Sequence, residues 1–354
     1  MSGGIAQLVA VGAQDAHLVG KPEVSFFQSI YKRHTNFSHV VERQVIQGNV
    51  SNGGMSTVRF ERKGDLLSYV YLAPSGGNPT VSLTVTDWTQ VISKVELLIG
   101  GQVIDDQSSV FSQRIAADLL AQTASKSPSA GHYSSENTPS YFYPLRFFFC
   151  ENWQSALPLV ALQYHDVEIR ITWGPQALSG SITTWECFAD FVYLDTEERT
   201  SIADRDHMML MYQVQKAAAS QNRVQELNFN HPIKFLSSYN ASTKNVLCAT
   251  NTKIKLQING TDVADFKYAV PHFTQTPTFY HTTNATNGNG TKRFLYPFCL
   301  ETSKLQPTGS LNFSRLDTAR LITDGTNNVT DDVYAVNYNI LKISNGMGGL
   351  MYAN

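Results

Sequence analysis

Residues 95–105, VELLIGGQVID, run as an apolar strand into a Gly-Gly turn, and residues 253–265, KIKLQINGTDVAD, repeat the pattern with an Asn-Gly turn. Glycine and asparagine adopt the backbone conformations that tight turns between strands require, so each stretch predicts a β-hairpin. A Tyr-Pro pair that opens another apolar segment follows each turn, at Tyr143 and at Tyr296. The same elements therefore occur twice in the same order.

A further short segment with strand character follows each Tyr-Pro pair, at residues 165–171 and 315–322. The turn and the Tyr-Pro pair are 43 residues apart in the first half of the chain and 36 in the second. Self-similarity in a fixed order at this scale predicts two copies of one β domain rather than a short-period solenoid. A duplicated β domain with no visible chemistry is typical of a building or binding unit.

The remaining patterns also favour an all-β fold. In residues 166–173 every second side chain is apolar, which predicts a strand with one buried face, and residues 81–85 show the same alternation. Residues 66–72 are almost continuously apolar, and we expect them to be buried on both faces. Turns rich in Gly, Asn and Pro separate these segments, so the chain is expected to form sandwiches or barrels of short strands.

Helical signals are few. Residues 109–122 place apolar side chains near helical spacing and predict a helix inside a long loop. Residues 195–209 hold the densest cluster of charges and predict a solvated helix or linker, so we expect the domain junction near residues 196–222. Two segments rich in small polar residues, 125–140 and 274–291, lie at equivalent places in the two halves and are expected to be exposed loops.

The length and composition limit the number of domains and the kinds of partner that the chain is expected to have. At 354 residues it has room for two domains of ordinary size, each with its own core. Charged residues make up only 16%, below the roughly 25% of an average soluble domain, which suits a protein packed against copies of itself. The net charge of −2 argues against direct contact with nucleic acid, because such binders carry a basic patch. The nearest candidate, residues 31–34, holds only three basic groups.

The termini and cysteines carry no special signal. Residues 1–10 lack the basic region of a signal peptide, and no run of about 18 apolar residues predicts a membrane span. No C-x-x-C pair occurs, and every cysteine has apolar neighbours, so we expect four buried free thiols. They are Cys150, Cys187, Cys248 and Cys299.

No residue is predicted to be catalytic, to bind a cofactor or to ligate a metal. The chain contains no H-E-x-x-H, G-x-x-x-x-G-K-S/T or G-x-S-x-G motif. Among nine histidines only His34 and His39 lie within five residues of each other, and each histidine is expected to have a hydrogen-bonded structural role. Acid pairs such as residues 105–106 lack the ligand spacing of a calcium loop. Of the N-x-S/T sequons, Asn284 and Asn289 in the second loop are the best candidates for modification.

Strings spread over nearly the whole chain resemble the double jelly-roll major capsid proteins of nucleocytoplasmic large double-stranded DNA viruses. Among the most recognisable is YKRHTNF at residues 31–37. The other matching strings include QLVAVGAQD at 7–15, FF at 26–27, IGGQ at 99–102, ALPLVALQYH at 156–165, YLDTEER at 193–199, QVQ at 213–215, LNFNHPIK at 227–234, QPTGSLNFSRLD at 306–317, YNILKI at 338–343 and NGMGGL at 345–350. The resemblance rests on the number and the order of these strings, because no single string would be enough to identify the family.

The resemblance implies a double jelly roll: two consecutive eight-stranded jelly-roll β-sandwiches with short helices in loops. It implies a homotrimer whose six jelly rolls form a pseudo-hexagonal capsomer of an icosahedral shell, over minor capsid proteins and near an internal membrane. The implied domains are an N-terminal base segment 1–24, a first jelly roll 25–197, a linker 198–222 and a second jelly roll 223–354. No enzyme activity and no cofactor are implied. The expected location is the virion capsid, assembled in the host cell cytoplasm.

Two other functions stay open at this point. A minor virion-surface protein of the same fold would bind a host receptor or glycan, since jelly rolls also serve lectins. Exposed aromatic residues in the two long loops would favour it, and those loops offer Tyr133 and the pair Phe279 and Tyr280. A jelly-roll enzyme of the cupin type would need a cluster of His and Glu ligands, which the sequence lacks.

Overall fold

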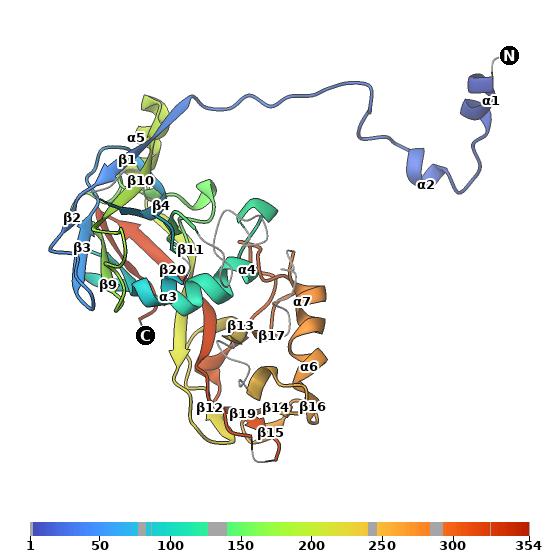
Figure 1. Cartoon of the computed structure of the whole chain (residues 1–354). Helices are drawn as coiled ribbons and strands as arrows, with labels where there is room; N and C mark the ends of the chain where they lie inside the picture. Colours follow the sequence, from blue (N-terminus) through green and yellow to red (C-terminus); the bar gives the residue numbers. More distant parts are fainter. Residues whose placement is uncertain are drawn as a thin grey trace. The chain divides into compact units, whose positions relative to one another are not determined.

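The computed structural model describes residues 3–76, 83–85, 87–126, 140–239, 246–283, 293–325 and 327–353. The chain forms two compact units, Met1–Asn36 and Phe37–Asn354 (Figure 1). The smaller unit contains two short helices, α1 (Gly3–Val9) and α2 (Ala16–Val19), neither of which has a buried residue. Its apolar side chains, such as Phe27, are exposed to solvent.

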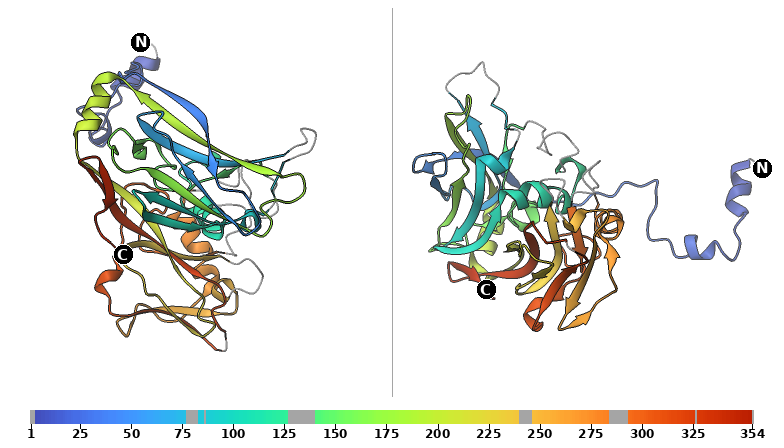
Figure 2. Two further views of the ribbon diagram at one scale, coloured as in Figure 1. Left: turned by 90° about the vertical axis from the view of Figure 1, so that its left-hand side faces the viewer. Right: turned by 60° about the horizontal axis from the view of Figure 1, so that its bottom comes forward.

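The first jelly roll consists of two antiparallel sheets (Figures 1 and 2). Its strands are β1 (Phe37–Gln44), β2 (Ile46–Gln47), β3 (Met55–Arg59), β4 (Leu66–Ser75), β5 (Ile92–Ile99), β6 (Gln102–Ser108), β7 (Tyr143–Pro144), β8 (Leu157–Pro158), β9 (Val167–Trp173) and β10 (Thr184–Leu194). One sheet has the order β1-β10-β4-β7, with β8 also paired to β4, and the other has the order β2-β3-β9-β5-β6. Several neighbours in each sheet, such as β1 and β10 or β3 and β9, are distant in sequence, as the Greek key connections of a jelly roll require.

The second jelly roll repeats this arrangement. Its strands are β11 (His207–Ala217), β12 (Val224–Glu226), β13 (Pro232–Tyr239), β14 (Lys253–Ile258), β15 (Thr261–Asp262), β16 (Lys267–Tyr268), β17 (Arg293–Pro297), β18 (Leu311–Asn312), β19 (Ala319–Thr323), β20 (Val333–Ser344) and β21 (Met347–Leu350). One sheet has the order β11-β20-β13-β17, and the other has the order β12-β19-β14-β15. Three short strands lie off these paths: β16 on β14, β18 on β13 and β21 on β20. The prediction of a double jelly roll is confirmed.

The two hairpins that suggested the duplication hold equivalent places in the two jelly rolls. Gly100 and Gly101 connect β5 to β6, Asn259 and Gly260 connect β14 to β15, and all four have positive φ. Such left-handed pairs fit the twist of a two-residue hairpin. The Tyr-Pro pairs lie in β7 and β17, and the later segments form β9 and β19. One more strand follows in each half. Strand β10 joins the sheet that contains β7, and strand β20 joins the sheet that contains β17.

Single strands show where local patterns succeed and fail. Strand β9 alternates between buried and half-buried side chains along its length, as the pattern of residues 166–173 predicted. The expectation that residues 66–72 are buried on both faces is wrong, because Tyr69 and Tyr71 of β4 are only half-buried on the outer face. Val81 and Ser82 lie outside the described residues, and Leu83, Thr84 and Val85 do not form the predicted strand. Val85 is buried and forms a bridge with Ser140.

Short helices lie in the connections between strands. The predicted helix of residues 109–122 is present as a π-helix, η1 (Phe111–Ala116), continued by α4 (Ala117–Leu119), and all these residues are buried. The charged segment forms α5 (Thr196–Asp204), which has no buried residue. The other helices among the described residues of this larger unit are α3 (Trp88–Val91), η2 (Ala124–Lys126), η4 (Trp153–Ser155), η5 (Val246–Cys248), α6 (Ala269–His272), α7 (Gln275–His281) and η6 (Phe313–Arg315).

The expected linker, residues 198–222, contains a full strand of the second jelly roll. Strand β11 pairs with β20 along eleven residue positions, from His207 opposite Ile343 to Ala217 opposite Val333. Only pairing with a strand more than a hundred residues away reveals this role. The other domain bounds stay predictions.

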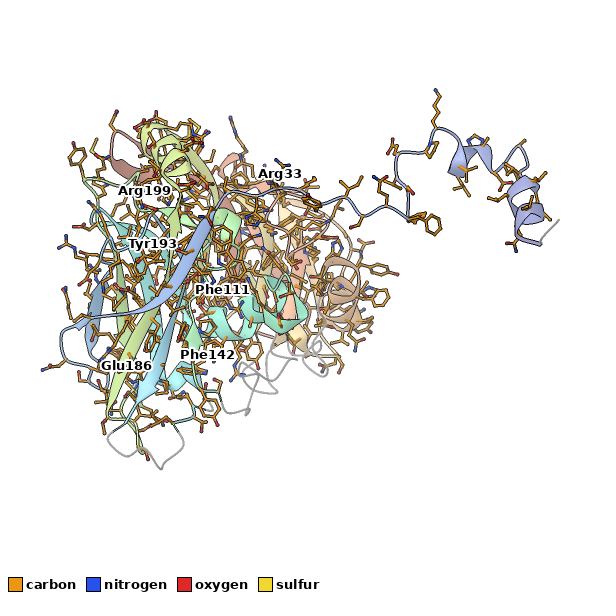
Figure 3. The ribbon with its side chains drawn as sticks, turned by 90° about the horizontal axis from the view of Figure 1, so that it is seen from above. Arg33, Phe111, Phe142, Glu186, Tyr193 and Arg199 are labelled. Atoms are coloured by element: carbon orange, nitrogen blue, oxygen red, sulfur yellow. The ribbon has the colours of Figure 1, made fainter. Side chains whose placement is uncertain are left out.

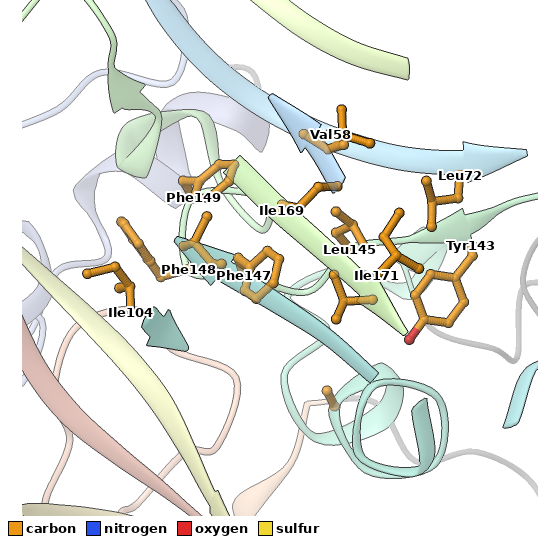
Figure 4. Close-up of a cluster of buried hydrophobic side chains, with 14 of the residues drawn as sticks. Val58, Leu72, Ile104, Tyr143, Leu145, Phe147, Phe148, Phe149, Ile169 and Ile171 are labelled. Atoms are coloured by element: carbon orange, nitrogen blue, oxygen red, sulfur yellow. The ribbon is translucent and has the colours of Figure 1, made fainter. Parts of the chain in front are cut away.

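The core of the first jelly roll lies between its two sheets (Figure 4). Inward side chains of β3, β4 and β9, including Val58, Leu72 and Ile169, pack with aromatic residues of the segment after β7. Trp88 of α3 closes one side of this core and is fully buried. The second jelly roll has a separate, smaller core that includes Leu236 and Leu256.

Candidate assembly interface

Within the chain, the outer face of one sheet of the second jelly roll is covered by the first jelly roll. Tyr334 and Val336 of β20 and Phe235 of β13 point away from the core of the second jelly roll and join the hydrophobic cluster of the first. Phe111 of η1 packs against Tyr334 with ring centres 5.8 Å apart. Strand β6 lies beside β11, where the side chain of Asp105 accepts a hydrogen bond from the backbone N–H of Val214 at 3.0 Å. The two jelly rolls thus share one continuous apolar interface.

A buried ion pair fixes the helical segment between β6 and β7 onto the second jelly roll. Arg293, at the start of β17, pairs with Asp118 of α4, and both side chains are almost completely buried. The Nε of Arg293 also donates a hydrogen bond to the carbonyl of Arg114 at 3.0 Å. The guanidinium of Arg114 lies 5.7 Å above the ring of Tyr239 on β13. Burial lowers the pKa of Arg293 to about 10, which leaves the guanidinium charged at neutral pH.

Asp105 is a second buried acidic group at this interface. Its carboxylate accepts hydrogen bonds from the N–H groups of Asp106 and Val214 and from Nε2 of Gln107, at 3.1, 3.0 and 2.7 Å. Burial nevertheless raises the pKa of Asp105 from its usual 3.8 to about 7, because the charged form loses its hydration. The interface between the jelly rolls therefore contains a carboxyl group that titrates near neutral pH.

The chain is expected to lose stability between pH 5 and pH 8 through Asp105. Because the folded pKa lies above the unfolded value, the contribution is fully present below about pH 4 and is lost as the pH rises towards 7. Linkage gives a loss of about 2–3 kcal/mol between pH 5 and pH 8 from this group. Urea denaturation at both pH values should show a smaller loss in an Asp105→Asn variant. If the unfolding free energy of the unmodified chain and of the Asp105→Asn variant changed equally with pH, the loss could not be assigned to Asp105.

Among the described residues, no segment of the chain gives the equivalent face of the first jelly roll such cover. Tyr71 of β4 lies opposite Pro144 of β7, as Phe235 lies opposite Pro297 of β17. Phe188 of β10 lies opposite Tyr71, as Val336 lies opposite Phe235. By register, Tyr71 and Phe188 therefore correspond to Phe235 and Val336. The latter two are fully buried, whereas Tyr71 and Phe188 are only half-buried.

Aromatic side chains dominate this open face. The ring of Tyr71 stacks on Phe188 at 5.3 Å and meets Phe142 edge-on at 5.9 Å. The ring of Tyr69 meets Trp153 edge-on at 6.3 Å. Beyond Phe188, Arg43 of β1 and Glu186 of β10 form an ion pair of 3.3 Å. Figure 3 labels Phe142 and Glu186 on this side of the first jelly roll.

The aromatic face is hollowed into a cavity of about 480 Å³ beside β4 and β7. Trp153 and Tyr141 line it and remain 60% and 66% exposed. Its floor includes a buried ion pair between Arg146 and Glu151, at 3.0 Å. Polar lining groups are few and include Ser68, Lys126 and Asn152. Apolar concave surface with few polar groups is typical of a place that another molecule covers.

Two family models together match almost the whole chain. The model of the major capsid protein N-terminus matches residues 25–202, and the model of the large eukaryotic DNA virus major capsid protein matches residues 198–349. The chain belongs to this capsid protein family. The resemblance drawn from the sequence strings is confirmed.

Relatives of this capsid protein span its full length. The major capsid protein of Pyramimonas orientalis virus is 34% identical over 402 aligned residues, and that of Paramecium bursaria Chlorella virus 1 is 30% identical over 445. Both alignments cover all of each chain.

Solved structures agree with the family. A quasi-atomic model of the PBCV-1 virus capsid has a TM-score of 0.75 and 27% identity, covering 93% of this chain and all of that chain. The Faustovirus major capsid protein has a TM-score of 0.65 at 10% identity, covers 94% of each chain, and therefore shows the fold alone.

The structure places several side chains of this capsid protein in structural roles that the sequence had predicted. His39 bonds to the buried Asp190 at 3.1 Å, and His165 bonds to the carbonyl of Gly348 at 2.9 Å. All four cysteines are free thiols, three of them buried and Cys150 half-buried. Burial raises the pKa of Cys187 to about 12, which makes this thiol unreactive.

The described part of the chain holds neither a metal cluster nor a membrane-spanning helix. Within the described ranges, no group of three His, Cys, Asp or Glu side chains is arranged to hold a metal ion. Nor does that part contain a helix long and apolar enough to cross a membrane. The sequons at Asn284 and Asn289, and the loop residue Tyr133, lie outside the described residues. Sequence reasoning missed the open face of β4, although tyrosine at alternate positions, 69 and 71, was a signal for a partly polar environment.

Proposed function

We propose that this capsid protein forms homotrimers, and that each trimer is a pseudo-hexagonal capsomer of the icosahedral shell of a large double-stranded DNA virus. The observation that carries the proposal is the aromatic face of β4 and β10, which is open although its counterpart in the second jelly roll is covered. A contact between two different surfaces of repeated units propagates until it closes a ring or makes a filament. Three chains supply six jelly rolls, which is the number that a hexagonal outline requires.

Family membership and composition support a structural, non-enzymatic role in the virion. A low charge limits self-repulsion when many copies assemble. The proposal includes minor capsid proteins beneath the shell, an internal membrane nearby, assembly in the host cytoplasm and no direct contact with nucleic acid. It also includes a base segment 1–24, a first jelly roll of residues 25–197, and a second jelly roll that begins at β11 and extends to residue 354. Exposed apolar side chains in residues 3–36 suit a segment that a partner covers.

The test is the mass of the purified chain in solution, measured by light scattering, with negative-stain images of the same peak. We expect three times the 39.3 kDa of one chain and particles with a hexagonal outline. An obligate interface of this kind should bury more than about 2,000 Å², so the trimer should persist on dilution. A chain that stays at 39.3 kDa at high concentration would contradict the proposal and favour the receptor-binding or glycan-binding alternative.

A further inference from the structure

We propose that helix α7 of a second copy of this chain inserts Phe279 and Tyr280 into the cavity beside β4 and β7. The inference rests on the proposed trimer and names the residues that join its copies. It comes from the interface inside one chain, which provides a template for the interface between chains.

Helix α7 presents two aromatic side chains that its own chain leaves in solvent. Phe279 is 77% exposed and Tyr280 is 71% exposed, and their rings meet edge-on at 4.9 Å. The helix is held against its own jelly roll, because it contacts β17 and Nδ1 of His281 is 3.0 Å from the carbonyl oxygen of Cys299. A fixed pair of exposed rings is the kind of anchor that dominates protein interfaces.

The place of α7 in the fold matches that of the helical segment that covers the second jelly roll. Segment η1–α4 lies between β6 and β7 of the first jelly roll, and α6 and α7 lie between β16 and β17 of the second. Within one chain, η1 packs on β13, and Asp118 of α4 pairs with Arg293 of β17. The strands equivalent to β13 and β17 are β4 and β7, which border the cavity. Repeating the same contact between copies places α7 over that cavity.

The β5–β6 and β14–β15 hairpins support the same correspondence between the contact within one chain and the contact between copies. Ile104 lies three residues after Gly101 and is buried where β6 meets β11. Val263 lies three residues after Gly260 in the second jelly roll and is 51% exposed. Strand β1, the equivalent of β11, is an edge strand with exposed Val40 and Val41. If the contact within one chain is repeated between copies, exposed Val263 of one copy therefore lies against exposed Val40 and Val41 of the next, beside the contact made by α7.

The chemistry of the cavity suits the two rings. Tyr69, Tyr71 and Trp153 offer aromatic faces and edges, and aromatic pairs gain energy beyond the area that they bury. The hydroxyl of a buried tyrosine needs a hydrogen-bond partner, and Lys126 and Asn152 in the lining can provide one for Tyr280. Insertion would also cover the rings of the cavity, which the described part of a single chain leaves open.

The first experiment removes the anchors. Light scattering of a Phe279→Ser/Tyr280→Ser variant should show a loss of mass from three chains to one, with cooperative unfolding retained because both side chains are exposed. The control is Tyr352→Ser, which removes a 54% exposed aromatic residue near the C-terminus and should leave the trimer intact. A double variant that stays trimeric would overturn the inference.

The second experiment tests the contact itself. Trp153→Cys and Tyr280→Cys are combined in a Cys150→Ser background, because Cys150 also lines the cavity. On a non-reducing gel the combined variant should run at two and three times the chain mass, whereas each single cysteine variant should run as one chain. Monomer bands alone from a protein that is trimeric by light scattering would overturn this contact and leave the trimer standing. A monomeric unmodified chain would overturn the proposed function and the inference together.

Discussion

Replacing Arg293 by methionine is expected to lower the free energy of unfolding by about 3–5 kcal/mol. Arg293 and Asp118 form a buried ion pair that joins β17 of the second jelly roll to α4 of the first. Without the guanidinium, the carboxylate of Asp118 would remain buried with no counter-charge. Urea denaturation followed by circular dichroism measures the loss. The expected size is large because a buried charge that loses its partner costs far more than the pair contributes.

Two further variants separate this effect from a general loss of charge. An Arg293→Met/Asp118→Leu double variant removes both charges and should recover most of the lost stability. Lys304→Met breaks a partly exposed pair with Glu301, which spans 2.8 Å, and should change stability by less than about 1 kcal/mol. If Arg293→Met were no more costly than Lys304→Met, the buried pair would not hold the two jelly rolls together.

Truncating Trp88 to alanine is expected to cost about 3–5 kcal/mol. Trp88 is fully buried, and its ring packs against Tyr143 and Trp185 at 5.4 and 5.7 Å. Its indole N–H donates a hydrogen bond to the hydroxyl of Ser140 at 2.7 Å, which would lose its partner. Thermal or urea unfolding of the Trp88→Ala variant checks the value.

An exposed aromatic residue provides the comparison for Trp88. Tyr352→Ala should change the unfolding free energy by no more than about 0.5 kcal/mol, because a large part of its ring is already in water. Comparable losses in the two variants would mean that the side of the core near α3 is not packed as the structure has it.

Much of the fold followed from local patterns. The alternation of residues 166–173 and the Gly-Gly and Asn-Gly turns predicted β9 and two hairpins, because side-chain period and positive φ are properties of a few adjacent residues. The helix at residues 109–122 was also visible as local spacing. The domain junction was harder, since β11 lies inside the expected linker and its role depends on pairing with β20.

The amino-acid sequence alone determined the class of this protein: a duplicated β architecture, a capsid family and a chain without catalytic motifs. The tertiary structure decided which face of each sheet is covered. Phe235 and Tyr71 hold equivalent positions in apolar strands, yet Phe235 is buried in the cluster of the first jelly roll and Tyr71 is only half-buried. Local periodicity reports that a face is apolar, but it does not report what covers that face. Coverage depends on segments brought together from distant parts of the chain, and for the face of Tyr71 we propose a second copy.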